Sequence, residues 1–137
     1  MTVLSNAIYD DLCQGCGPAE ASCTMAEMIP AFQELFEPDQ SRLFALIGRI
    51  KRLFALGACA DAASGRGRTA HFKRHDVWTL AILMELTEIG FSPAAAIQSG
   101  ARGDLVSRNG TVVQIDYDTL LKVLYRHLPH LFERKVV

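Results

Sequence analysis

The stretch at residues 76–98, DVWTLAILMELTEIGFSPAAAIQ, decides the fold of this chain. Its first part carries apolar residues on nearly every side of a helix: Val77, Trp78, Leu80, Ile82, Leu83, Met84, Leu86 and Ile89. This pattern predicts a buried central helix rather than a surface helix with one apolar stripe. Gly90 is expected to end that helix, and Ser92 followed by Pro93 predicts the start of a second, short helix.

The size and composition of the chain limit its class. It has 137 residues, and 50% of them are hydrophobic, which suits one domain with a sizeable core. No apolar run approaches the roughly 20 residues of a membrane span, and the start lacks the pattern of a secretory signal. We therefore expect a cytoplasmic protein whose four cysteines stay reduced.

The net charge of −1 hides a strong segregation of charge. Residues 1–41 hold seven acidic side chains and no Lys or Arg, whereas residues 42–75 hold eight basic side chains and one acidic one. Such an asymmetry suggests a polyanionic partner. The alternative is that the acidic and basic blocks neutralise each other within the fold.

Residues 42–56 show the clearest helical period. An apolar stripe follows the i, i+3, i+4 rule: Leu43, Leu46, Ile47, Ile50, Leu53 and Phe54. The opposite side carries long basic residues beside small ones: Arg42, Arg49 and Arg52 with Ala45 and Gly48. That side could approach a grooved partner closely, although an ordinary amphipathic surface helix has the same pattern. Gly57 is expected to end the helix.

The next stretch, GRGRTAHFKRHDV at residues 65–77, is basic and has no helical period. We expect a hairpin within residues 58–75, with Arg66 and Arg68 at its tip. A P-loop is excluded, because no Lys-Ser or Lys-Thr pair follows the glycines. A metal site at His71 and His75 is disfavoured, because residues spaced i, i+4 share a face only on a helix, and these two flank a predicted helix start.

Weaker local signals come from the two ends of the chain. Residues 1–12 are expected to form a short helix, and Thr24 with Glu27 predicts a capping box that starts another. Pro30 should break or kink that helix or restart it, and Asp39 or Ser41 should cap the next one.

In the tail, Asn109-Gly110 predicts a β-hairpin. Asp118 is expected to cap a last helix over residues 119–128, which Pro129 should disturb. The apolar face of that helix either folds back onto the core or forms a two-fold interface.

Three stretches resemble the MerR family of bacterial regulators in their order and spacing. They are IKRLFALGA at 50–58, TAHFKRHDV at 69–77 and LTEIGFSPAAAIQ at 86–98, which resemble the end of that family's recognition helix, the end of its wing and its G-F-S turn. The resemblance covers residues 24–98 and implies a winged helix-turn-helix. The chain departs from the family in its longer first helix and turn, and in lacking the long dimerisation helix, so ligand sensing is not implied.

The expected fold is therefore mainly α with small β-hairpins: an acidic arm at 1–23, a MerR-like domain at 24–98, and a hairpin–helix tail at 99–137 that could dimerise. The resemblance implies a sequence-specific regulator of transcription that binds double-stranded DNA through a recognition helix at 42–56 and a wing at 64–75, as a nucleoid-associated homodimer. The expected DNA contacts are Arg42, Arg49, Lys51, Arg52, Arg66, Arg68, His71, Lys73 and Arg74.

Other functions stay open at this point. One alternative is a protein interaction module that uses the acidic arm, and another is an architectural protein of the phage-excision type with the same fold. No nucleophile–base pair or pair of carboxylates can be assigned, so an enzyme is not expected. The remaining candidates are metal ligands for zinc or an iron–sulfur cluster, although buried reduced thiols explain them as well: Cys13, Cys16, Cys23 and Cys59.

Overall fold

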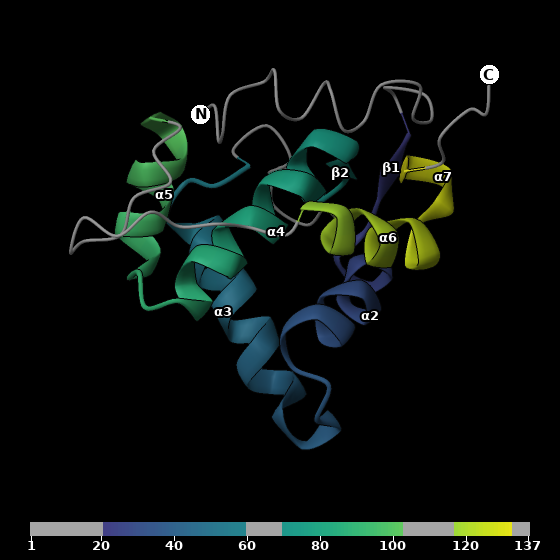
Figure 1. The fold of residues 1–137 in the computed structure, drawn as a ribbon, viewed down its shortest axis with the longest axis horizontal. Helices are drawn as coiled ribbons and strands as arrows, with labels where there is room; N and C mark the ends of the chain where they lie inside the picture. The colour runs from purple at the N-terminus through teal and green to yellow at the C-terminus, as the bar shows by residue number, and fades with distance from the viewer. Residues whose placement is uncertain (1–20, 60–69, 103–116, 133–137) are drawn as a thin grey trace.

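The computed structural model describes residues 21–59, 70–102 and 117–132 of the chain. This part is mainly helical, with six α-helices, one 3₁₀ helix and a two-stranded antiparallel sheet. The helices surround a single hydrophobic core (Figure 1). None of the helices in these ranges is long and apolar enough to cross a membrane. The predicted helix at 1–12 and the Asn109-Gly110 hairpin lie outside the described residues.

Helix α4 (Arg74–Glu88) is the buried central helix that the sequence predicts. Nine of its residues are buried, among them Trp78 at 1% exposure, and it packs against α2, α3 and α5. Gly90 ends it with a φ of +107°, while the amide of Phe91 donates to the carbonyl of Leu86 and closes a Schellman motif. Ser92 then caps α5 (Pro93–Arg102) by accepting a hydrogen bond from the amide of Ala95.

Helix α2 (Met25–Phe36) begins with the predicted capping box between Thr24 and Glu27. Of the three expected effects of Pro30, the break and the restart are wrong, because the helix continues through this residue for 12 residues in all. Proline removes one backbone donor and crowds the preceding turn. The four buried residues of α2 offset that cost by packing into the core.

Helix α3 (Leu43–Ala55) follows a short 3₁₀ helix, η1 (Gln40–Arg42). Asp39 caps η1, whereas the N-cap of α3 itself is Arg42, which makes no side-chain capping hydrogen bond. The apolar stripe of α3 faces the core, with Leu46, Ile50 and Leu53 fully buried. The predicted stop at Gly57 is confirmed, because its φ is +102° and the amide of Ala58 donates to the carbonyl of Leu53.

The small sheet joins two distant parts of the chain. Strand β1 (Ser22–Cys23) pairs antiparallel with strand β2 (Phe72–Lys73), so that Cys23 lies opposite Phe72. The partner of β2 in the described ranges is therefore a strand 50 residues upstream, whereas the expected hairpin paired it with residues just after Gly57. The first arm of that hairpin lies mostly within residues 60–69, which the structure does not describe. Because β1 is part of the fold, the folded unit starts before the expected boundary at Thr24.

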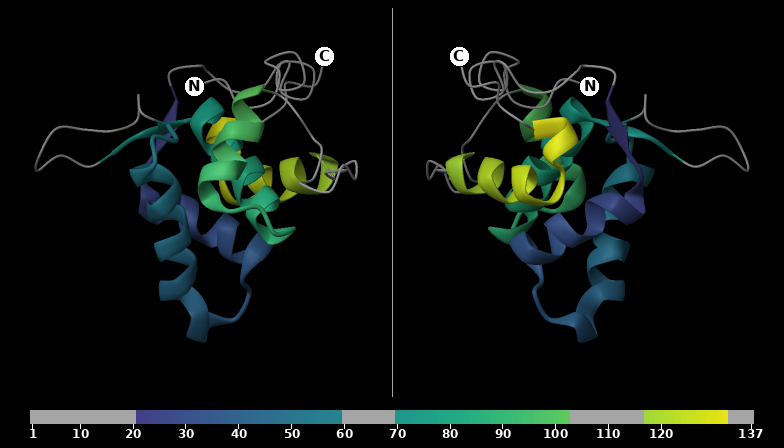
Figure 2. Two further views of the ribbon diagram at one scale, coloured as in Figure 1. Left: turned by 90° about the vertical axis from the view of Figure 1, so that its left-hand side faces the viewer. Right: turned by 90° about the vertical axis from the view of Figure 1, so that its right-hand side faces the viewer.

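The tail contributes two helices to the same core. Helix α6 (Tyr117–His127) packs against α2, and α7 (Pro129–Phe132) follows directly (Figures 1 and 2). The expected N-cap at Asp118 is wrong, because the helix already begins at Tyr117 and Asp118 lies in its first turn. Pro129 does end α6, and it becomes the first residue of α7.

The apolar face of α6 is covered within the chain. Four residues of the helix and one beyond it are buried: Leu120, Leu121, Val123 and Leu124 in the helix, and Leu128 after it. Arg126 Nη1 lies 2.6 Å from Glu34 Oε2, and His127 Nε2 lies 3.1 Å from Glu34 Oε1, which ties α6 to α2. The tail therefore folds back onto the core, and this face is not available for the two-fold interface considered above.

Candidate nucleic-acid interface

Helix α3 presents one face to solvent at the edge of the molecule. Its start and the turn from α2 project away from the other helices in all three views (Figures 1 and 2). At about 100° per residue, its exposed residues share an arc of about 120°. We call this the outer face of α3, and it consists of Phe44, Ala45, Gly48, Lys51, Arg52 and Ala55.

Two cations on the outer face are not engaged by the fold. Lys51 and Arg52 are both exposed, and within the described ranges neither side chain forms a hydrogen bond or an ion pair. They follow each other in the third turn of α3, so their charges add at one place on the surface. Among the described residues, no acidic side chain pairs with either cation, whereas Asp10, Asp11 and Glu20 of the acidic block lie outside them.

Two other expected contacts on or near α3 are engaged within the fold. Arg49 Nη2 lies 2.6 Å from Glu88 Oε1 and donates a hydrogen bond to Thr87 Oγ1 at 3.1 Å. Arg42 belongs to η1, and its Nε lies 3.6 Å from Glu37 Oε2, with 65% of its side chain exposed. Arg49 is thus held toward α4, whereas Arg42 is only loosely paired.

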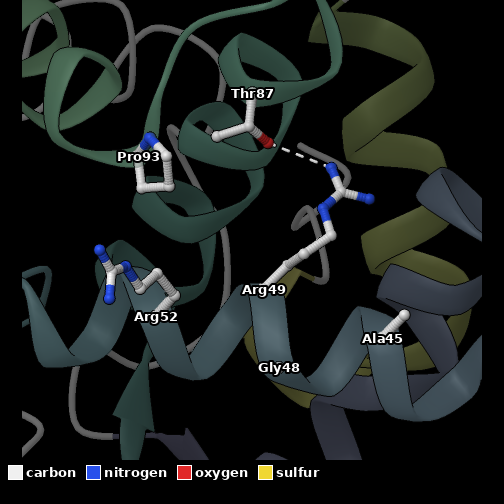
Figure 3. A pocket seen from close by; sticks show the side chains of 6 residues that line it. All are labelled: Ala45, Gly48, Arg49, Arg52, Thr87 and Pro93. Carbon is white, nitrogen blue, oxygen red and sulfur yellow. Dashed lines mark hydrogen bonds between the residues drawn. The ribbon is translucent and has the colours of Figure 1, made fainter.

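A pocket lies on the flank of α3, where it meets the end of α4 and the start of α5. It measures about 310 Å³, and its lining residues are Ala45, Gly48, Arg49, Arg52, Thr87 and Pro93. Figure 3 shows the two arginine side chains at opposite sides of this space, Arg52 below Pro93 and Arg49 reaching Thr87. The guanidinium of Arg49 is held by its partners, so Arg52 is the cation of this pocket that remains able to bind an anion.

Gly48 is a glycine that the fold does not require. It lies in the middle of α3, and a Cβ added there would meet nothing within 4 Å. Glycine in a helix interior costs roughly 0.5–1 kcal/mol relative to alanine. Neither backbone geometry nor packing among the described residues therefore explains the glycine.

Strand β2 lies beside the second half of α3. The rings of Phe54 and Phe72 are 5.6 Å apart between centroids, which fixes this neighbourhood. His71 and Lys73 flank the buried Phe72, and both are exposed, because alternate residues of a strand point to opposite sides. Two of the expected contacts of the wing therefore lie on the surface next to α3.

The other expected contacts lie either at the start of α4 or outside the described residues. Arg74 and His75 lie in the first turn of α4, are half-buried, and each interacts with other residues of the chain. The carboxylate of Asp76 accepts a hydrogen bond from the amide of Lys73 at 3.0 Å, so the start of α4 already has an anion close to it. Arg66 and Arg68 lie outside the described residues.

Sequence reasoning missed one residue of this surface, Phe44. It is 87% exposed, although it is a large apolar residue. The signal was available, since Phe44 falls outside the apolar stripe of α3 and on the same side as Gly48. An aromatic residue on the solvent side of an amphipathic helix is the pattern that should have marked it.

The cysteines in the described ranges do not form a metal site. Cys23 and Cys59 are both buried and reduced, and no group of three or more metal-binding side chains occurs in this part of the chain. Burial, followed by the nearby charges of Glu27 and Asp76, raises the pKa of Cys23 to about 12. Such a thiol resists the ionisation that a metal ligand needs. Cys13 and Cys16 lie outside the described residues.

Comparison with known proteins finds no matching family model, no similar curated protein and no similar solved structure.

Proposed function

We propose that the protein is a sequence-specific, double-stranded DNA-binding regulator of transcription that places the outer face of α3 in the major groove. One observation carries the proposal: exposed, unengaged cations at Lys51 and Arg52 stand beside Gly48, a helix glycine that packing does not explain. Arginine and lysine are the commonest readers of guanine, and the major groove admits an α-helix. Without a side chain at Gly48, the groove floor and the helix backbone approach more closely.

The arrangement of elements supports a winged helix-turn-helix as the framework. The order α2, α3, β2, α4, α5 agrees with the order of helices that the resemblance to MerR-like domains implies, whereas the pairing of β2 with β1 is not part of that expectation. The six residues from 37 to 42, with η1 among them, make a longer connection than the usual three- to four-residue turn. In this proposal, His71 and Lys73 contact phosphates beside the groove that α3 occupies.

A homodimer belongs to the same proposal. One small domain contacts few base pairs, and two copies give useful specificity on a two-fold operator. Because the apolar face of α6 is buried against the core, the contact between the two copies involves another surface.

Binding to duplex DNA at several salt concentrations tests the proposed function. Each phosphate contact adds about 0.9 to the slope of log affinity against log salt. We expect micromolar or tighter binding at low salt and a steep salt dependence. The double variant Lys51→Ala/Arg52→Ala should lose more affinity for a selected duplex than for random duplex DNA, because base contacts carry the discrimination. Lys122→Ala, which removes an exposed cation on α6, is the matched control and should bind like the wild type.

Two results would contradict this account. The absence of binding at low salt would favour a protein interaction module instead. An equal loss of affinity in the Lys122→Ala control would show that only the overall charge matters, and not the outer face of α3.

A further inference from the structure

Phe44 differs from every other phenylalanine of the chain. All seven lie in the described ranges, and the other six are buried or half-buried: Phe32, Phe36, Phe54, Phe72, Phe91 and Phe132. Phe44 is 87% exposed. Single exposed apolar residues are ordinary on protein surfaces, so exposure alone decides nothing. The location of Phe44 on α3 is what indicates a function for its exposed ring.

Phe44 stands at the end of α3 that projects from the molecule. It is the second residue of the helix, whose start lies farthest from the other helices (Figures 1 and 2). Gly48 lies one turn further along the same face and Lys51 two turns further. Seven residues of helix span about 10 Å, which matches about three base-pair steps of 3.4 Å.

The surroundings of Phe44 indicate what kind of surface it meets. An apolar protein partner would favour an apolar patch around the ring, but the outer face otherwise consists of small residues and cations. A polyanion that offers an isolated apolar group fits these surroundings better. In the major groove, the C5-methyl group of thymine is such a group, and it lies among the acceptor atoms and phosphates that Lys51 and Arg52 would contact.

We propose that Phe44 determines specificity by packing against the C5-methyl group of a thymine, about three base pairs from the base that Lys51 contacts. This inference rests on the proposed DNA-binding function, and it identifies a thymine as the base that the first turn of α3 contacts. N-terminal residues of a helix in the major groove are those that reach the base edges.

Uracil substitution tests the inference, because uracil lacks only the C5-methyl group. A preferred duplex is first selected from random sequences with the full-length protein. Each thymine is then replaced singly by uracil, and the affinity is measured by fluorescence anisotropy. The wild type should lose affinity roughly fourfold at one thymine, as expected for one methyl group left in water. Phe44→Ala should bind the thymine and uracil duplexes equally.

Two further variants make the result specific. Phe44→Leu keeps an apolar side chain and should retain part of the sensitivity at the same position. Tyr125→Ala removes an exposed aromatic residue of α6 and should keep the full sensitivity of the wild type. All three variants should unfold at the temperature of the wild type within a few degrees, because these side chains contribute little to the core.

The outcomes separate this inference from the proposed function. Unchanged uracil sensitivity in Phe44→Ala, or a wild type that tolerates uracil at every position, overturns the role of Phe44 but leaves DNA binding in place. A change of oligomeric state in Phe44→Ala with unaltered DNA affinity also overturns it, because the ring then contacts a second copy of the chain. A wild type that binds no duplex overturns both proposals.

Discussion

Arg49 of α3 and Glu88 of α4 form an ion pair with Nη2 and Oε1 2.6 Å apart, and the same nitrogen donates to Thr87 Oγ1 at 3.1 Å. The three groups join the flank of α3 to the last turn of the central helix. This link, together with the buried stripe of α3, fixes which side of α3 faces outward. Lys51 and Arg52 consequently point to solvent, while Arg49 links α3 to α4.

The first prediction separates Arg49 from its neighbour. Arg49→Ala should lower the free energy of unfolding by up to about 1 kcal/mol, since both partners are more than a third exposed and water screens the pair. Glu88→Ala should have a similar effect, and the double variant should show coupling. Arg52→Ala should leave stability unchanged. Urea denaturation of the four variants and the wild type measures this, and additive effects of Arg49→Ala and Glu88→Ala would contradict the ion pair.

The second prediction uses Gly48, where stability and function should move in opposite directions. Gly48→Ala should stabilise the protein by roughly 0.5–1 kcal/mol, because it raises helix propensity and its methyl group meets no neighbour. Gly48→Leu should fold equally well, but it should weaken duplex binding at least tenfold, because the side chain keeps the helix backbone away from the groove. A Gly48→Leu variant with wild-type affinity would exclude close approach at this position.

The third prediction concerns acid stability through Glu34. The hydrogen bond to His127, together with Arg126, holds the pKa of this carboxyl below its ordinary value of 4.5. A lowered pKa in the folded state stabilises the protein above pH 4.5, and that contribution is lost as the pH falls through the folded-state pKa. Glu34→Gln should therefore be less stable than the wild type at pH 7, and the difference in stability should be smaller at pH 3. A gap that stays constant in thermal unfolding at both pH values would contradict the pairing.

The fourth prediction concerns the buried thiol of Cys23. With its pKa raised from 9.0 to about 12, the thiolate fraction in the native state is about 1,000-fold lower than for an ordinary thiol. Alkylation of Cys23 by iodoacetamide at pH 8 should be slow in the native protein and fast in urea. Peptide mass spectrometry resolves this cysteine from the other three. Equal rates in the two conditions would show that Cys23 is accessible in the native protein.

Local chemistry made much of the fold predictable. The all-round apolar pattern predicted α4 as the central helix. Gly57 and Gly90 predicted the ends of α3 and α4, because a positive φ is costly for other residues. The Thr24–Glu27 capping box and the Ser92 cap were also correct, since such caps depend on neighbours within three residues. The break or restart expected at Pro30 was wrong, because tertiary packing of α2 outweighs a lost backbone donor.

Long-range relationships were not predictable from the same chemistry. The pairing of β2 with Ser22–Cys23 depends on a contact across 50 residues, and two-residue strands carry no periodic signal. For the site, a helical projection grouped Arg49 with Arg52, but the partner of Arg49 at Glu88 is 39 residues away and appears only in three dimensions. Phe44 lies on the polar side of the same projection, so its exposure was predictable from the sequence.

Backbone chemical-shift mapping tests the central claim most directly, namely that the outer face of α3 is the surface that binds duplex DNA. Isotope-labelled protein is titrated with a selected duplex, and the amide shifts are followed by NMR. We predict that the largest changes occur at residues 44–55, with further changes at 71–73, while the amides of α6 stay in place. Changes centred on α6 and α2, or no changes at a duplex concentration well above that of the protein, would contradict the account.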